Sequence, residues 1–132
     1  MQPFILNEIY QIAKPFGYNQ TFVIDRPYFA FIRNQADLED VTLGSTMNAS
    51  FFTGIFYLFG KVPPYLRSNV QEAIIWFSKA GNQGHAGAQC VLGILYYYGT
   101  HDVVARDRNV AMRWFYRAGE WHNSLKKKTQ ST

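Results

Sequence analysis

The segment FFTGIFYLFG at residues 51–60 recurs without a gap as CVLGILYYYG at residues 90–99, at a spacing of 39 residues. Four positions are identical in the two copies: Gly54 and Gly93, Ile55 and Ile94, Tyr57 and Tyr96, and Gly60 and Gly99. A second match, at a spacing of 38, pairs Ala73, Trp76, Phe77, Ala80 and Gly81 with Ala111, Trp114, Phe115, Ala118 and Gly119. Self-similarity at a period of roughly 20–50 residues indicates a stacked repeat architecture.

Each repeat unit is predicted to contain two helices. Ala88, Leu92 and Tyr96 recur at helical intervals, and glycine follows at the position where a helix often ends. The second helix of each unit begins after a residue that can accept hydrogen bonds from free backbone amides, Asn69 or Asp107. A glycine within a helix costs about 1 kcal/mol relative to alanine. We therefore expect the two mid-helix glycines to allow close approach of a facing helix, with small alanines opposite and tryptophan beside them.

These positions together resemble the Sel-one-like (SLR) repeat family, which is related to the tetratricopeptide repeats, over residues about 49–120. In the second unit the matching residues are Ala86, Ala88, Leu92, Gly93, Tyr96, Gly99, Val104, Asp107, Ala111, Trp114 and Ala118. In the first unit the repeat positions are Gly54, Tyr57, Gly60, Ala73, Trp76 and Ala80. The resemblance implies a mainly α fold with two helix-turn-helix units, at about 47–84 and 86–122. It also implies a non-enzymatic adaptor or scaffold that binds other proteins along a curved helical surface.

Residues 1–46 are expected to cover the front of the first unit, because solenoid repeats bury their apolar faces only against neighbours. Residues 3–14 are predicted as a short amphipathic helix with Ile5, Ile9 and Ile12 on one stripe. Beyond it, residues 22–24 and 28–32 have the alternation typical of strands, so we expect a β-hairpin cap.

The same hairpin region resembles a second family. FVIDRPYFAFIR at residues 22–33, with Gly44 beyond it, is similar to the closing segment of serpins, where it forms a hairpin. The upstream hinge and most of the serpin body are missing from the sequence. A serpin-related fragment without inhibitory activity is therefore a third hypothesis for the chain.

Composition and charge limit the classes of protein to which the chain can belong. Its 132 residues are 48% hydrophobic and only 17% charged, which excludes intrinsic disorder over most of the length. The net charge of +4 is concentrated in residues 101–132, and residues 123–132 are expected to form a basic flexible tail. A single cysteine excludes an intrachain disulfide. Because no signal peptide or membrane span is recognised, we expect a cytoplasmic protein.

Motifs that carry catalysis are missing from the sequence. It contains no phosphate-binding glycine loop, nucleophile elbow or paired-histidine metalloprotease motif. The candidate metal ligands are irregularly spaced, which favours structural roles for His85, Cys90, His101, Asp102 and His122. We expect neither an enzyme nor a metal or cofactor site.

The aromatic residues outside the repeat positions predict a partner-binding surface. Three consecutive tyrosines cannot all face inward on one helix, because neighbouring side chains point about 100° apart. The expected anchors are the apolar residues Phe56, Phe59, Leu95, Tyr97 and Tyr98, complemented by the basic residues Arg106, Arg113 and Arg117. A protein partner is the main hypothesis, and self-association is a second way to cover these aromatics. Binding of nucleic acid or another acidic partner through the basic helix face is the alternative.

Overall fold

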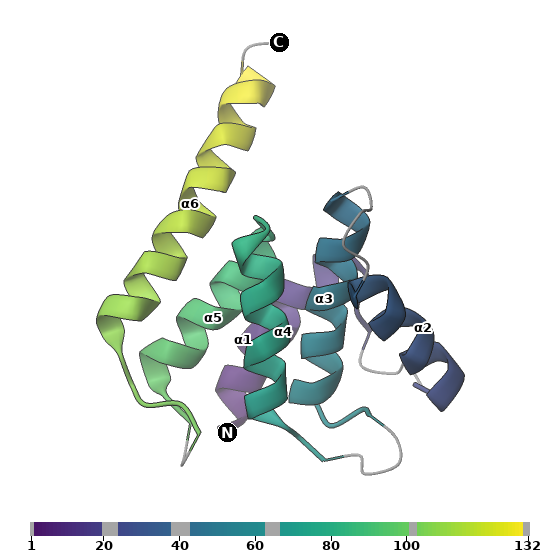
Figure 1. Cartoon of the computed structure of the whole chain (residues 1–132). Helices are drawn as coiled ribbons and strands as arrows, with labels where there is room; N and C mark the ends of the chain where they lie inside the picture. The colour runs from purple at the N-terminus through teal and green to yellow at the C-terminus, as the bar shows by residue number, and fades with distance from the viewer. Residues whose placement is uncertain (1, 20–23, 38–42, 63–66, 101–102, 131–132) are drawn as a thin grey trace.

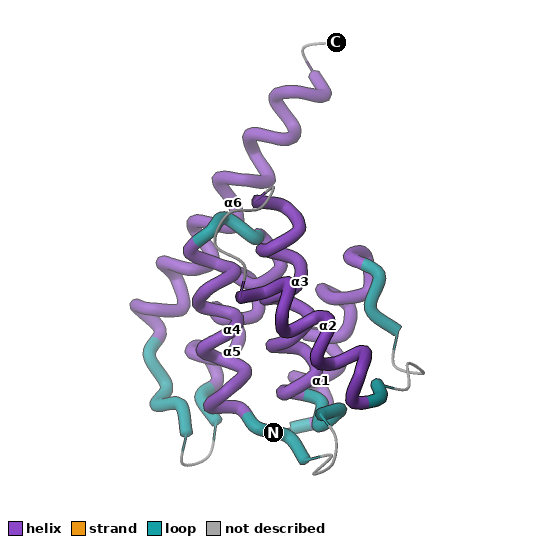
Figure 2. Tube along the Cα trace, turned by 45° about the vertical axis from the view of Figure 1, so that its right-hand side comes forward, coloured by secondary structure: helices purple, strands orange, loops and turns teal. Residues whose placement is uncertain are grey.

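The computed structural model describes residues 2–19, 24–37, 43–62, 67–100 and 103–130, and the regular elements in this part of the chain are helices (Figures 1 and 2). They are α1 (Pro3–Ala13), a 3-10 turn η1 (Lys14–Phe16), α2 (Arg26–Asp37), α3 (Leu43–Leu58), α4 (Val70–Asn82), α5 (Ala86–Tyr98) and α6 (Arg108–Gln130). The predicted mainly helical fold is confirmed.

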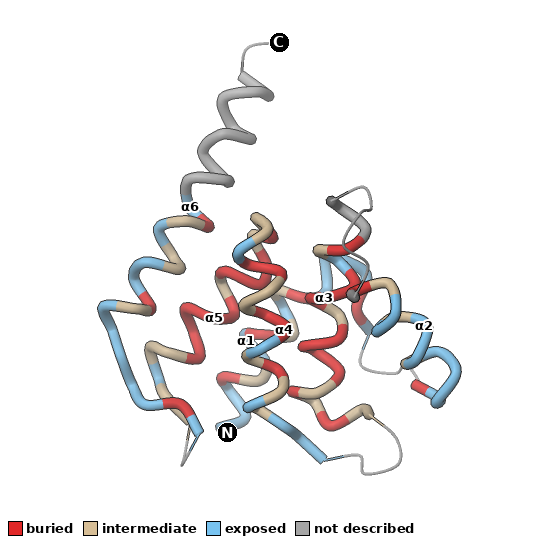
Figure 3. The backbone as a smooth tube through the Cα atoms, in the orientation of Figure 1, coloured by how far each residue is buried: buried red, intermediate tan, exposed pale blue. Residues whose placement is uncertain are grey.

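The two sequence repeats form two helix pairs, α3 with α4 and α5 with α6. Each helix from α2 to α6 packs against the next, so these helices follow one another in a row from right to left in Figure 1. The predicted caps are confirmed: Asn69 Oδ1 accepts from the Glu72 amide at 3.0 Å and Asp107 Oδ1 from the Val110 amide at 3.1 Å. The buried residues are concentrated on α3, α4 and α5, the middle of the row (Figure 3).

The two mid-helix glycines lie against aromatic rings of the following helix. A Cβ atom at Gly54 would lie 2.7 Å from the ring of Phe77, and one at Gly93 would lie 2.5 Å from the ring of Phe115. The expected close approach is confirmed, but the expectation that alanine faces these glycines is wrong. Phenylalanine occupies the facing position in both repeats, and only a residue without a side chain leaves room for it.

The expected β-hairpin is wrong, because residues 26–37 form helix α2. Asp25 Oδ1 accepts a hydrogen bond from the Tyr28 amide at 2.8 Å, and Pro27 lies in the first turn, where its fixed φ suits a helix. Phe29, Ile32 and Ala36 follow at helical spacing and pack on the core. Residues 22–23 of the expected hairpin lie outside the described part of the chain, and the described part does not support the serpin-like hairpin.

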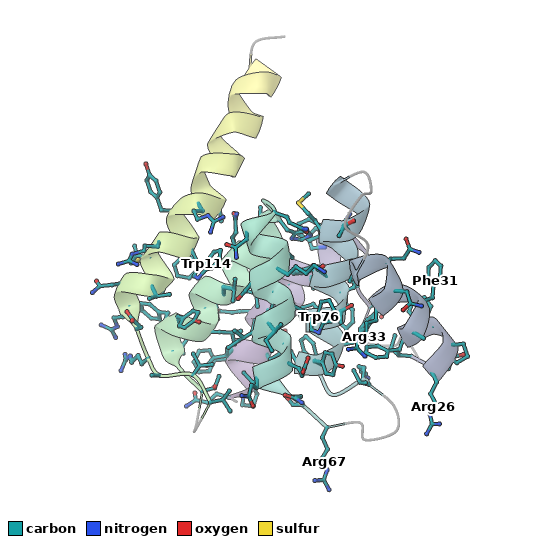
Figure 4. All side chains as sticks on the ribbon, viewed as in Figure 1. Arg26, Phe31, Arg33, Arg67, Trp76 and Trp114 are labelled. Carbon is teal, nitrogen blue, oxygen red and sulfur yellow. The ribbon has the colours of Figure 1, made fainter. Side chains whose placement is uncertain are left out.

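Helix α2 has the place that the second helix of a preceding repeat would have. Lys79 of α4 donates to the carbonyl oxygen of Ala36 near the end of α2, and its Nζ lies 5.4 Å from the ring centroid of Trp76. In the next repeat Arg117 of α6 donates to the carbonyl oxygen of Gly81 near the end of α4, at 3.1 Å, and its Cζ lies 4.6 Å from the ring centroid of Trp114. Figure 4 labels Trp76 and Trp114, the tryptophans of the two contacts. Because these contacts are equivalent, a helix covers the first repeat where a hairpin was expected.

Helix α6 extends beyond the repeat positions. Its backbone is helical through Gln130, whereas the sequence predicted a flexible tail from residue 123. Figure 1 shows this end of α6 reaching past the other helices. Among the helices of the described residues, none combines the length and the apolar character needed to cross a membrane.

Candidate protein-interaction surfaces

Residues 2–19, which we call the N-terminal segment, lie along the first helices of the two repeats. Helix α1 packs against α5 and lies behind α4 and α5 in Figure 1. Its buried side chains Ile5, Ile9 and Ala13 belong to the same apolar core as α3 and α5. We call the surface of α3 and α5 that this segment covers the inner face.

Aromatic contacts attach the N-terminal segment along the inner face. At one end the ring centroids of Phe4 and Tyr98 are 5.5 Å apart, with the rings nearly perpendicular. At the other end Phe16 lies 5.4 Å from Phe51. Tyr18 lies 5.6 Å from Phe59 in a stacked arrangement, and it is almost fully buried. Such aromatic pairs add to the stability that burial of apolar area provides.

The five predicted apolar anchors differ in how far they are exposed beside the N-terminal segment. Phe56 and Leu95 are each only 1% exposed, so the expectation that they form part of a surface is wrong: both lie in the core. Phe59 is half-buried beneath Tyr18, and Tyr97 is half-buried with Arg108 Cζ 4.9 Å from its ring centroid. Tyr98 keeps 40% of its surface exposed and is the most accessible of the five predicted anchors.

The predicted basic residues divide in a similar way. Arg106 and Arg113 are exposed. Arg117 is half-buried, and besides its bond to Gly81 it donates to Asn82 Oδ1 at 3.3 Å. Its charge therefore serves the contact between α6 and α4, and less of it is available to a partner.

The outer face of α6 carries two large exposed side chains that the sequence analysis did not identify. Met112 is 58% exposed and Tyr116 is 69% exposed. With Arg113 and Arg117 they line a shallow apolar cleft of about 550 Å³. The available signal was their four-residue spacing, which places both on one helix face at positions outside the repeat pattern. We call Met112, Arg113 and Tyr116 the α6 face.

The geometry of His85 makes it a helix cap and not a metal ligand. Its Nδ1 accepts a hydrogen bond from the Ala88 amide at 3.1 Å, and its Nε2 lies 3.0 Å from Asn48 Oδ1, so both ring nitrogens are engaged. The ring stacks on Phe51 at 4.4 Å and lies 4.5 Å from Phe16. Desolvation by burial lowers the pKa of His85 to about 4. The His85 ring is therefore neutral in the folded protein at pH 7.

Acidification should destabilise the protein through His85. The unfolded imidazole gains its proton near pH 6.5 and the folded one only near pH 4, so the unfolded state binds more protons between these values. The contribution of the neutral His85 ring to the free energy of unfolding is fully present above pH 6.5, and it is lost as the pH falls toward 4. We expect the free energy of unfolding to decrease by about 2 kcal/mol between pH 7 and pH 5, measured by urea denaturation. His85→Asn keeps a capping side chain that does not titrate, so the free energy of unfolding of this variant should depend less on pH. An unchanged pH dependence in the variant would contradict the role assigned to His85.

The other candidate metal ligands are Cys90, His101, Asp102 and His122. Within the residues that the structure describes, no group of three histidine, cysteine, aspartate or glutamate side chains could hold a metal ion. His101, Asp102 and the side chain of His122 lie outside that part. Cys90 is a half-buried free thiol on α5, and burial raises its pKa.

Comparison with known proteins yields one match. The family model described as Sel1 repeat matches residues 48–85 and 86–120, more than half of the chain. No curated protein and no solved structure matches the chain. The first matched range runs from within α3 to the end of α4, and the second runs from the start of α5 to the middle of α6.

Proposed function

Because the chain belongs to the Sel1 repeat family, we propose that it is a non-enzymatic module that binds a protein partner through the α6 face. Sel1 repeats are commonly protein–protein interaction modules, and the family is generally non-catalytic. The family relationship supports the general role, and the choice of surface rests on exposure and chemistry.

The observation that carries the proposal is the pairing of large apolar side chains with a free arginine on one helix face. Met112 and Tyr116 expose more than half of their surface, and Arg113 lies between them on the same face. Methionine, tyrosine and arginine are enriched at protein interfaces, and tyrosine and arginine are enriched among the residues that contribute most to affinity. The partner therefore presents an apolar group for the cleft and a carboxylate for Arg113.

A matched pair of variants tests this surface. We expect the double variant Met112→Ala/Tyr116→Ala to reduce the recovery of a cross-linked protein partner by about tenfold or more, as loss of a central anchor does. Phe31→Ala is the control, because Phe31 is also 58% exposed but lies on α2, at the other end of the row. Quantitative mass spectrometry of the cross-linked species measures both. Equal recovery with the two variants would contradict the assignment of the α6 face.

Nucleic acid is the alternative ligand for the basic residues near α6. Arg106 and Arg113 are exposed, whereas Arg108 and Arg117 contact aromatic rings of the chain itself. Phosphate contacts make affinity fall steeply with salt, while an apolar protein contact persists. Titration of a labelled single-stranded oligonucleotide at two salt concentrations separates the two ligands, and tight, salt-sensitive binding would favour nucleic acid.

A further inference from the structure

The N-terminal segment lies outside the row of packed helices formed by α2 to α6. Helix α2 already covers the first repeat, as shown by the equivalent contacts of Lys79 and Arg117. Helix α1 instead lies on α5, and the aromatic residues that follow it lie on the end of the inner face formed by α3. The segment is thus an addition to the solenoid, on a surface that the repeats themselves leave uncovered.

Its chemistry is that of an amphipathic helix bound in a groove. Ile5, Ile9 and Ala13 are buried at four-residue spacing, while Asn7, Glu8 and Gln11 on the other side are exposed. Helical segments of partner proteins bind in apolar grooves through apolar side chains at this spacing.

The aromatic anchor at the end of the segment fits a matching surface. Phe16 packs against both His85 and Phe51, and a Cβ atom at Gly87 would lie 2.7 Å from its ring. The glycine on α5 therefore makes room for this ring. Phe16 nevertheless keeps 37% of its surface exposed, and Phe4 at the opposite end keeps 48%.

The segment fills the inner face incompletely at both ends. A cavity of about 750 Å³ lies beside the start of α1, lined in part by Pro3, Tyr98 and Arg106. A second, almost wholly apolar cavity of about 400 Å³ lies beside its end, between Ile12, Phe16 and Cys90. A helix with larger side chains at its two ends would bury more apolar area there than the resident segment does.

We propose that the N-terminal segment is a resident, displaceable ligand of the inner face, and that this face binds an amphipathic helix of a partner protein in its place. The incoming helix carries apolar residues at four-residue spacing and aromatic residues beyond its end. An acidic residue near its start suits Arg106. This second binding site is independent of the α6 face, so either can fail without the other.

Binding in trans of a synthetic peptide with the sequence of residues 2–19 tests the proposal. In the full chain the attached segment competes with the peptide, which lowers the apparent affinity by the fraction of molecules with a free inner face. The variant Phe4→Ala/Phe16→Ala weakens that competition by removing two partly exposed anchors. We expect it to bind the labelled peptide at least about tenfold more tightly than the unaltered chain does. A peptide with Ile9→Asp is the control and should not bind.

Cys90 gives a second readout in the same samples. Because it lines the cavity beside Ile12 and Phe16, departure of the segment exposes its thiol to alkylation. We expect faster alkylation in the Phe4→Ala/Phe16→Ala variant and renewed protection when the peptide is added. Equal peptide affinity in the two proteins, or no binding by a folded variant, would overturn the proposal.

Native-state hydrogen exchange of the unaltered chain keeps the test valid if the variant does not fold. A displaceable segment requires that the amides of α1 exchange through a local opening, at a lower free energy than those of α3 and α5. Exchange of α1 only through global unfolding would overturn the proposal, whatever the variant does.

Discussion

Replacement of Phe51 by alanine is expected to lower the free energy of unfolding by about 3–5 kcal/mol, the range observed when a buried phenylalanine is truncated. Phe51 is fully buried. Its ring centroid lies 4.4 Å from that of His85 and 5.9 Å from that of Phe77, so one side chain joins α3 to α4 and to the start of α5. Truncation removes these contacts and leaves a cavity that the surrounding helices fill only partly.

Urea denaturation at pH 7 measures the effect. Phe31→Ala on α2 is the matched control, because Phe31 is 58% exposed and points away from the other helices in Figure 4. We expect this substitution to change stability by no more than about 0.5 kcal/mol. Similar losses in the two variants would show that Phe51 does not have the central position assigned to it.

The second prediction concerns the two mid-helix glycines. We expect Gly54→Ala and Gly93→Ala to lower the free energy of unfolding by about 2 kcal/mol each, and the double variant by about 4 kcal/mol. A new Cβ atom would lie within 3 Å of the Phe77 ring at the first site and of the Phe115 ring at the second. Phe77 is fully buried and Phe115 is half-buried, so the helices must separate or the rings must leave their positions. This cost exceeds the gain of about 1 kcal/mol in helix propensity from glycine to alanine.

Gly119→Ala on α6 separates the steric effect from helix propensity. Gly119 is the repeat counterpart of Gly81, but nothing lies within 4 Å of the position that its Cβ would occupy. The same substitution there should therefore raise stability by up to about 1 kcal/mol. Thermal unfolding of the four variants tests the contrast. If Gly93→Ala were as stable as Gly119→Ala, the close approach of α5 and α6 would be contradicted.

The wrong prediction of a hairpin came from a sequence pattern that is compatible with both a strand and a helix. Residues 28–32 are all aromatic or aliphatic, a composition typical of a strand, and they also satisfy a helical stripe through Phe29 and Ile32. Helix α2 forms because Asp25 caps its first turn and Ala36 and Ile32 find a core on α3 and α4. That core is assembled from residues far along the chain, which a local pattern does not contain.

The candidate surface was predicted only in part for the same reason. Arg113 and Tyr98 are exposed, whereas Phe56 and Leu95 are buried and Tyr116 was not identified. Periodicity places these residues on helix faces, but it does not say which neighbour covers each face. The N-terminal segment covers the inner face, whereas the α6 face is exposed because α6 lies at the end of the row of described helices.

The sequence by itself determined the two repeats, the residues that begin and end their helices, and the close approach at the two mid-helix glycines. These features are encoded within a few residues of one another, by helical spacing, capping side chains and the lack of a side chain at Gly54 and Gly93. Only the tertiary structure decided that α2 covers the first repeat and that the N-terminal segment lies on the inner face. Both results depend on burial between distant segments, where the free energy comes from apolar area that no single stretch of sequence contains.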